Sequence, residues 1–259
     1  MLQGAASRDT EDEGVLLDAW LPHGLRLMQQ PLAVGIQTLQ LVVPFDVDAV
    51  CDLYIGRGQE DADPYWSRPW PSAVALASEL LRRPELVAGQ RTVEVGAGLG
   101  VATIAAALAG AAEAVATDRE PLALMRAQHG ASAHQVRAEL LDWAAVRTSG
   151  RRYDLVLACD VLYEAFSVEP VAALVARLVH LDGGRLLLAD PLERTRHHRE
   201  LFVELLQAAP RRGGGRLVLE EASVIQAVVG ARDVPTAVQL LAFRSSLGAD
   251  TVGVKRLQH

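Results

Sequence analysis

From residue 91 onward, short apolar runs alternate with longer amphipathic segments. The apolar runs predict strands over residues 92–96, 114–118, 136–140, 154–159, 185–189, 216–220 and 237–243. The segments between them predict helices over residues 100–111, 120–130, 168–180 and 196–208. Two runs, Leu155–Ala158 and Leu186–Ala189, are apolar at every position, as expected for strands that helices cover on both faces. The alternation indicates βαβ units, and therefore an α/β fold with a largely parallel sheet.

The pattern changes at both ends of this alternation. Over residues 223–236 no helical pattern separates the last two strands, so we expect an antiparallel pair at the edge of the sheet. Near the N-terminus, Leu39–Val43 alternates as in a half-buried strand or hairpin. Ser72 is expected to cap a helix that ends at Pro84. We predict three parts: a disordered tail over 1–13, a β-rich extension over 14–63, and an α/β domain over 64–259.

Composition and charge exclude several classes of protein. The chain of 259 residues carries a formal charge of −7 and has no basic face, which argues against nucleic acid as a partner. Its two cysteines, Cys51 and Cys159, are far apart and predict neither a disulfide framework nor a zinc site. An acidic N-terminal segment and the lack of a long apolar run predict a cytoplasmic protein without membrane contact.

One strand-to-helix turn carries the strongest indication of function. It places glycines at every second position, Gly96, Gly98 and Gly100, before an alanine-rich helix. Glycine adopts the positive φ angles that such a sharp reversal needs, and its missing side chain lets a nucleoside cofactor lie against the backbone. The dinucleotide fingerprint requires a further glycine at the position of Val101. The spacing therefore favours S-adenosylmethionine (SAM) over NAD.

Polar and aromatic residues close the next three strands. Asp118 can accept hydrogen bonds from ribose hydroxyls, or it can cap the helix that follows. Asp142 and Trp143 can flank an adenine, although a tryptophan after a strand is more often part of the core. Asp160 and Tyr163 follow the fourth strand and are expected opposite the glycine turn, where the switch point of a doubly wound sheet binds ligands. A simple helix-capping role for Asp160 is the alternative.

Other candidate features carry less weight. Trp66 and Trp70 lie in a loop before the first helix and form either a buried plug, which we favour, or the lip of a pocket. His197 and His198 are adjacent, so on a helix they diverge and make a poor metal-binding pair. The chain also lacks the Asn-Pro-Pro-Tyr element that enzymes methylating amino groups of DNA or glutamine carry at the position of Asp160.

Together these segments resemble methyltransferase family 16, whose seven-β-strand members include the lysine methyltransferases of calmodulin, valosin-containing protein and the electron transfer flavoprotein β subunit. The resemblance covers about residues 64–192. It rests on Trp70-Pro71-Ser72, Val93-Glu94-Val95-Gly96-Ala97-Gly98-Leu99-Gly100, Ala116-Thr117-Asp118, Leu141-Asp142-Trp143 and Asp160-Val161-Leu162-Tyr163-Glu164.

The resemblance implies a Rossmann-like SAM-dependent methyltransferase domain with strand order 3-2-1-4-5-7-6 and an antiparallel seventh strand. It also implies a monomer that uses SAM to N-methylate a lysine side chain of a protein substrate. By position, it assigns methyl transfer to Asp160 and Tyr163, and it implies a reaction without a metal ion. It assigns cofactor binding to Trp70, Glu94, Gly96, Gly98, Gly100, Asp118, Asp142, Trp143 and Cys159.

Three other functions stay open at this point. A small-molecule N- or O-methyltransferase has the same fold, because fold does not fix the substrate. A non-catalytic partner protein of this fold is disfavoured, since the glycines and Asp160 are all present. An oxidoreductase comes last because of Val101. The segment 124–129 lacks the asparagines of many family members, whereas Asp190-Pro191 is similar to the flavoprotein-directed enzymes.

Overall fold

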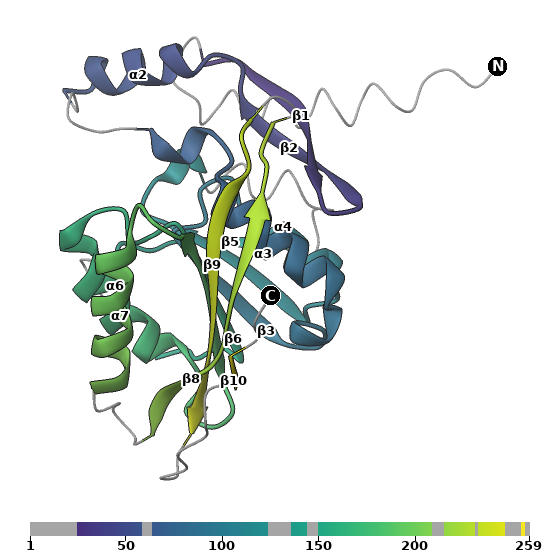
Figure 1. The fold of residues 1–259 in the computed structure, drawn as a ribbon. Coiled ribbons are helices and arrows are strands. Elements are labelled where there is room, and N and C mark those ends of the chain that lie inside the picture. The colour runs from purple at the N-terminus through teal and green to yellow at the C-terminus, as the bar shows by residue number, and fades with distance from the viewer. Residues whose placement is uncertain are drawn as a thin grey trace.

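A mixed β-sheet forms the centre of the molecule in the computed structural model (Figure 1). The structure describes residues 25–58, 64–123, 136–143, 150–208, 215–230, 233–246 and 255–256. The strands of the sheet, in chain order, are β3 (Arg91–Val95), β4 (Glu113–Asp118), β5 (Val136–Leu140), β6 (Leu155–Cys159), β7 (Arg185–Pro191), β8 (Arg216–Ala227), β9 (Thr236–Ser246) and β10 (Lys255–Arg256).

The order of the strands confirms the topology expected from the sequence. Across the sheet they run β10-β8-β9-β7-β6-β3-β4-β5, which is the order 3-2-1-4-5-7-6 with the two-residue strand β10 added at one edge. Strand β9 pairs antiparallel with both β7 and β8, and the other pairings are parallel. Because β3 lies between β4 and β6, the chain reverses its direction of travel across the sheet at β3, where ligands bind in doubly wound folds.

Helices cover both faces of the sheet. Helices α3 (Pro71–Arg82) and α4 (Val101–Leu108) pack on one face, and α6 (Val168–Leu178) and α7 (Arg196–Ala208) on the other. Strand β6 shows the consequence, because Leu155 and Leu157 belong to the first core cluster while Val156 belongs to the second. An uninterrupted apolar strand is therefore buried on both sides, as the sequence indicated. The short 3₁₀ segments are η1 (Tyr65–Ser67), η2 (Pro84–Leu86) and η3 (Ala165–Ser167).

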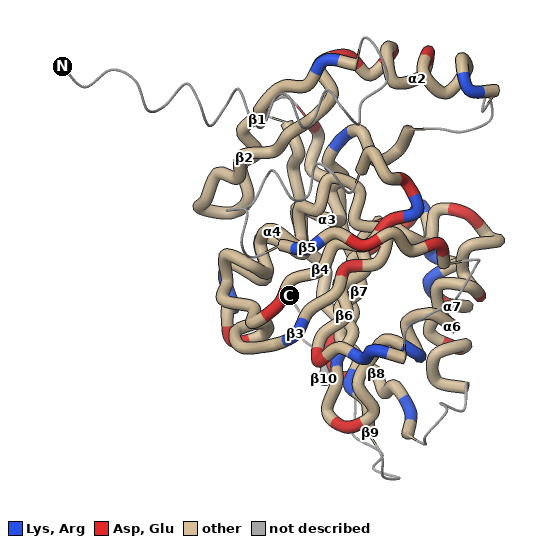
Figure 2. The backbone as a smooth tube through the Cα atoms, turned by 180° about the vertical axis from the view of Figure 1, so that it is seen from behind, with Lys and Arg blue, Asp and Glu red and all other residues tan. Residues whose placement is uncertain are grey.

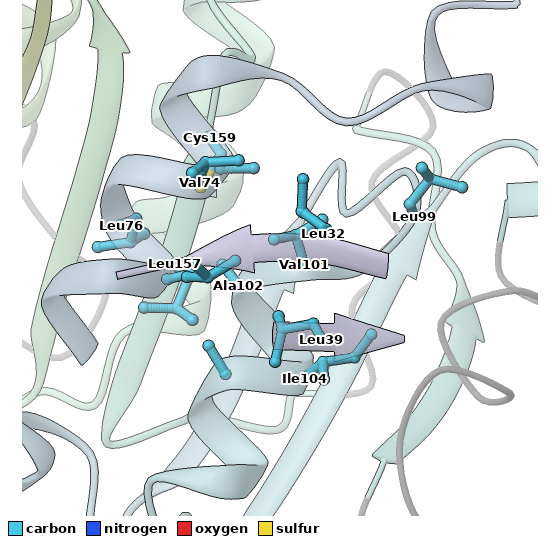
Figure 3. Packing of buried hydrophobic residues seen from close by; sticks show 14 of the residues in the cluster. Leu32, Leu39, Val74, Leu76, Leu99, Val101, Ala102, Ile104, Leu157 and Cys159 are labelled. Carbon is cyan, nitrogen blue, oxygen red and sulfur yellow. The ribbon is translucent and has the colours of Figure 1, made fainter. Parts of the chain in front are cut away.

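A hairpin and a helix precede this domain. Strands β1 (Leu27–Val34) and β2 (Gln37–Pro44) pair antiparallel through a two-residue turn, confirming the hairpin expected around Leu39–Val43. Helix α2 (Val47–Gly56) follows, with its N-terminus capped by the side chain of Asp46. Leu32 and Leu39 lie over α4 (Figure 3) and share one core cluster with Ile104, so the hairpin has no separate core. The proposed boundary at residue 63 and the tail over 1–13 lie outside the described residues.

Several element limits differ from those expected. Helix α3 begins at Pro71 with Trp70 as its N-cap, so the expected cap at Ser72 was wrong: proline favours the first helical position, and Ser72 is buried within the helix. Strand β8 continues to Ala227, because β9 pairs with it over its whole length. Helix α4 ends at Leu108, just before a glycine with positive φ. The structure describes only residues 120–123 of the helix expected over 120–130. The stretch 124–129 lies outside the described residues.

Charged residues lie around this framework. Figure 2 shows acidic and basic residues of both signs on the loops and helices, whereas β6 carries none. Among the parts of the chain that the structure describes, no helix combines the length and apolar character needed to cross a bilayer.

Candidate active site

A cavity of about 640 Å³ opens at the carboxyl ends of β3, β4, β5 and β6; we call it the larger cavity. Parallel strands all end at this edge, so residues that are far apart in the sequence meet there. Gly100 is not part of the lining and instead is the N-cap of α4. The predicted site residues that line the larger cavity are Trp70, Glu94, Gly96, Gly98, Asp118, Asp142, Trp143, Cys159, Asp160 and Tyr163.

The glycine turn has the backbone conformation that its sequence indicated. Gly96, Gly98 and Gly100 have φ angles of +65°, +53° and +73°, which other residues rarely adopt. Space is the second constraint at Gly96, where a Cβ atom would lie 2.9 Å from Cγ1 of Val161 and 3.0 Å from Cζ3 of Trp143. Gly96 is therefore required both by its φ angle and by the side chains that pack over it.

Glu94 is a fully enclosed carboxylate on the wall of the larger cavity. Its Oε2 accepts hydrogen bonds from the backbone N–H of Thr103 at 2.8 Å and from the hydroxyl of Thr103 at 2.5 Å. Its Oε1 is buried without a hydrogen-bond partner. Burial raises the pKa of Glu94 to about 7 against these bonds. Cys159 is buried beside it, and burial raises the pKa of that thiol well above its usual value, so it is not a thiolate nucleophile.

Asp118 ties two turns together. Its Oδ2 accepts from the backbone N–H of Gly98 and its Oδ1 from that of Glu120, both at 2.9 Å. Burial raises the pKa of Asp118, while these two backbone N–H groups oppose the rise. Each carboxylate oxygen still has a second lone pair with which to accept a ligand hydroxyl. Asp118 thus caps the following turn and still faces the cavity, so the two alternatives are compatible.

Aromatic residues close the opposite side of the larger cavity, and two of them, Tyr54 and Tyr65, were not among the candidates from the sequence. The hydroxyl of Tyr54 donates to Oε2 of Glu120 at 2.7 Å and accepts from Nε1 of Trp66 at 2.8 Å. Burial raises the pKa of Tyr54, so the hydroxyl stays protonated. Trp66 is buried and also lines the cavity, so for this residue the two alternatives, a buried plug and the lip of a pocket, both hold. Tyr54 and Glu120 come from segments whose periodicity predicted nothing about their pairing.

A second, smaller cavity of about 450 Å³ shares a wall with the first; we call it the smaller cavity. The ring of Tyr65 lies edge-on to Trp70 at 5.9 Å and to Tyr163 at 5.2 Å between centroids. Nε1 of Trp70 donates to the carbonyl of Tyr65 at 2.8 Å, which fixes the indole. The residues that line the smaller cavity are Tyr65, Trp70, Asp160, Tyr163, Glu164, Ala165 and Arg194, of which the first four also line the larger one.

Asp160 stands on this shared wall in a strained conformation. Its φ of +54° makes it the one non-glycine residue with positive φ among those described. Its backbone N–H donates to the carbonyl of Ala189 at 2.9 Å, and its Oδ1 forms a close ion pair with Arg194. Its Oδ2 is buried without a hydrogen-bond partner. Burial raises the pKa of Asp160, and the guanidinium of Arg194 opposes this rise.

A sequence model describing lysine methyltransferases, methyltransferase family 16, matches residues 66–209, more than half of the chain. The chain belongs to this family. The match includes every predicted site residue, from Trp70 to Tyr163.

Named relatives in this family are electron transfer flavoprotein beta subunit lysine methyltransferases. The chain is 32% identical to that of Xenopus laevis over 137 residues, covering 50% of this chain and 53% of the relative. It is 32% identical to that of Danio rerio over 139 residues and 28% identical to that of Homo sapiens over 131 residues, covering 50% of each chain in both cases. The matched segment thus spans about half the length of these relatives.

Solved structures agree with the fold. PH1948 of Pyrococcus horikoshii superposes with a TM-score of 0.53 at 17% identity, over 70% of this chain and 89% of that one. TrmN of Thermus thermophilus superposes with a TM-score of 0.51 at 18% identity, over 67% of this chain and 49% of that one. At these identities the likeness concerns the fold alone, which is that of Rossmann-like SAM-dependent methyltransferases.

Proposed function

We propose that this chain is a SAM-dependent methyltransferase that N-methylates a lysine side chain of a protein. The observation that carries the proposal is the wall shared by the two cavities, where Asp160 faces a cofactor-sized space on one side and an aromatic-lined space on the other. Membership of the lysine methyltransferase family supports the reaction. The relatives named above make the electron transfer flavoprotein β subunit the first substrate to test. We propose a cytoplasmic monomer as the acting form.

The larger cavity suits a cationic nucleoside. Its wall carries five carboxylates, those of Glu94, Asp118, Glu120, Asp142 and Asp160, against the guanidinium groups of Arg68 and Arg119. SAM brings a positive sulfonium and an ammonium group, which such a wall attracts, whereas the diphosphate of a nicotinamide cofactor would be repelled. When bound, SAM supplies the methyl group on a sulfonium leaving group.

Each predicted cofactor-binding residue has a proposed task in this cavity. Glu94, Gly96 and Gly98 would hold the methionine part. Asp118 would accept from the ribose hydroxyls. The remaining proposals are adenine contacts by Asp142 and Trp143, closure over the cofactor by Trp70, support of the turn by Gly100, and packing against the cofactor by Cys159.

Asp160 would orient the amine that receives the methyl group. Lysine must react as the neutral amine, although its pKa in water is ~10.4. The aromatic side chains of Tyr65, Trp70 and Tyr163 lower the polarity beside Asp160, and low polarity disfavours the ammonium form. Oδ2 of Asp160, buried and unpartnered, can accept an N–H bond and fix the direction of the nitrogen lone pair. Tyr163 would pack beside the lysine stem.

The direct test is transfer of labelled methyl groups. We expect the purified chain with radiolabelled SAM to label recombinant electron transfer flavoprotein β subunit, or a protein band in a lysate. Mass spectrometry should then find the added methyl groups on a lysine. If the label is instead found only in small solutes, both before and after protease treatment, the chain is a small-molecule methyltransferase. Absence of SAM binding in calorimetry would end the proposal.

A variant of Asp160 tests the proposed role of its carboxylate. Asp160→Asn keeps the backbone conformation, because asparagine also adopts positive φ, but it removes the charge. We expect kcat to fall about 100-fold through lost orientation, with SAM affinity within about tenfold of the wild type. Glu169→Gln, an exposed carboxylate in the first turn of α6, is the matched control and should transfer normally. An Asp160→Asn enzyme with normal turnover would contradict the assignment.

A further inference from the structure

Arg194 is a charged residue of the smaller cavity that none of the sequence motifs includes. It lies in the turn between β7 and α7, and its side chain is half exposed. One of its guanidinium nitrogens, Nη2, donates to Oδ1 of Asp160. The same guanidinium lies 5.6 Å from the centroid of the Trp70 ring. Arg194 therefore contacts two residues that line both cavities.

The turn that presents Arg194 is tied down by a buried ion pair. Asp190 is fully buried and accepts from Nη1 of Arg199 at 3.0 Å and from the hydroxyl of Thr195. Arg199 also donates to the carbonyls of Pro191 at 2.8 Å and Leu192 at 2.6 Å. Charge-assisted bonds of this kind fix geometry as well as adding energy. Arg194 is thus held from a constrained backbone.

The arrangement divides the two oxygens of Asp160 between different tasks. Oδ1 is held by Arg194, and Oδ2 is buried and has no hydrogen-bond partner. A carboxylate facing the acceptor nitrogen alone would stabilise the ammonium form and so hinder the reaction. Paired with a guanidinium, the same carboxylate can accept an N–H bond while the pair as a whole carries no net charge. The partner cation removes the disadvantage of placing an acid beside the nucleophile.

We infer that Arg194 is a positioning residue for methyl transfer, which holds Oδ1 of Asp160 so that Oδ2 accepts from the incoming lysine amine and which keeps the pair neutral towards that amine. This inference rests on the proposed function.

Other groups around Asp160 do not replace this effect. The hydroxyl of Ser72, on α3, interacts with Asp160 and lowers its pKa but carries no charge, and Cys159 on β6 has a buried thiol whose pKa is raised. Asp190 on β7 is a like charge, already paired with Arg199. Arg194 is therefore the cation that interacts most directly with Asp160 among the described residues. The remaining titratable groups in the wall of the smaller cavity are Tyr65, Tyr163 and Glu164.

The test is the pH dependence of kcat at saturating SAM and flavoprotein β subunit. In the wild type, kcat should rise with pH as the bound lysine loses its proton. In Arg194→Met the unneutralised carboxylate stabilises the ammonium, so we expect this midpoint to move up by about one pH unit. Arg194→Lys retains the charge and should keep the wild-type midpoint. SAM affinity, measured by calorimetry, should stay within about threefold in both variants.

Arg196→Met is the matched control, because Arg196 is an exposed arginine two residues away whose partner is Glu200. It should leave the midpoint unchanged. A merely structural role for Arg194 would lower kcat equally at every pH, and that result would overturn the inference while leaving the proposed function standing. Absence of any transfer by the wild type would overturn both. If Arg194→Met fails to fold, Arg194→Gln replaces it. The inference is then supported if the midpoint of the pH profile is that of the wild type in Arg194→Lys and is shifted up in Arg194→Gln.

Discussion

The larger cavity has two walls that were built in different ways. One, the motif wall, consists of Glu94, Gly96, Gly98, Asp118 and Asp160, which all lie at strand ends. Its geometry comes from local turns, in which Gly96, Gly98 and Asp160 have positive φ angles. Short backbone-to-carboxylate bonds, such as that between Gly98 and Asp118, then join one turn to the next.

The other, the cap wall, consists of Tyr54, Tyr65, Trp66, Arg68 and Trp70, which precede the sheet in the chain. It is held by side-chain contacts between distant segments, and the bond from Tyr54 to Glu120 spans 66 residues. The difference teaches where each wall is vulnerable. A single substitution can destroy a turn that only glycine can form, whereas a wall of separate contacts should weaken in steps.

The largest expected effect is on the motif wall at Gly96. Gly96→Ala places a Cβ at a positive φ and within 2.9 Å of Val161, so the turn must move. We expect SAM affinity to fall roughly 1,000-fold, or about 4 kcal/mol, in calorimetry. Gly89→Ala is the control: its φ is +71°, but the Cβ would meet nothing within 4 Å. If both variants bind SAM equally well, the motif wall does not depend on this turn.

A smaller effect concerns the contribution of Glu94, in the motif wall, to the free energy of unfolding. The pKa of Glu94 rises from its ordinary 4.5 to about 7 on folding, so the folded state binds more protons between these values. Its contribution to the free energy of unfolding is therefore favourable below pH 4.5 and is lost as the pH rises towards 7. At roughly 1.4 kcal/mol per pH unit this amounts to about 3 kcal/mol. Keeping a carboxylate in the wall thus costs stability at neutral pH.

Glu94→Gln removes this titration and keeps an acceptor for Thr103. We expect the Tm of the variant, relative to the wild type, to rise by roughly 5–10 °C between pH 5 and pH 8. Scanning fluorimetry across this range is the measurement. Glu85→Gln, an exposed carboxylate in η2, should follow the wild type at every pH. Parallel curves for Glu94→Gln and the wild type would mean that Glu94 does not titrate in this range.

The two walls also differ in how far the sequence predicted them. The strands and the residues at their ends followed from patterns within short windows, because apolar runs define strands and parallel strands end at one edge, whereas the strand order followed from the family resemblance. That is why Asp160 could be expected opposite the glycine turn although the two are far apart in the chain.

The cap wall and the partner of Asp160 could not be predicted in this way. Periodicity indicates which face of an element is buried, but it does not say which distant polar groups will pair across two elements. The bond from Tyr54 to Glu120 and the ion pair of Asp160 with Arg194 both depend on packing between segments. The predicted cap at Ser72 was wrong for a local reason, since Pro71 set the start of α3 two residues earlier than a cap at Ser72 allows.

The smallest expected effect is on the cap wall at Tyr54. Tyr54→Phe removes the hydroxyl that joins Trp66 to Glu120 and leaves both groups without this partner. A net hydrogen bond is worth about 1 kcal/mol, so we expect SAM affinity to fall only about fivefold. Combining it with Glu120→Gln in a double-mutant cycle should show coupling, because both substitutions break one bond.

Tyr153→Phe is the matched control for Tyr54→Phe. Tyr153 is equally buried but belongs to the core cluster on the other face of the sheet and does not line the larger cavity. It should leave SAM affinity unchanged. Loss of all SAM binding in Tyr54→Phe would show that the cap wall is as brittle as the motif wall, because one hydroxyl would then control the whole cavity. Unchanged affinity would show that α2 closes the cavity without helping to bind SAM.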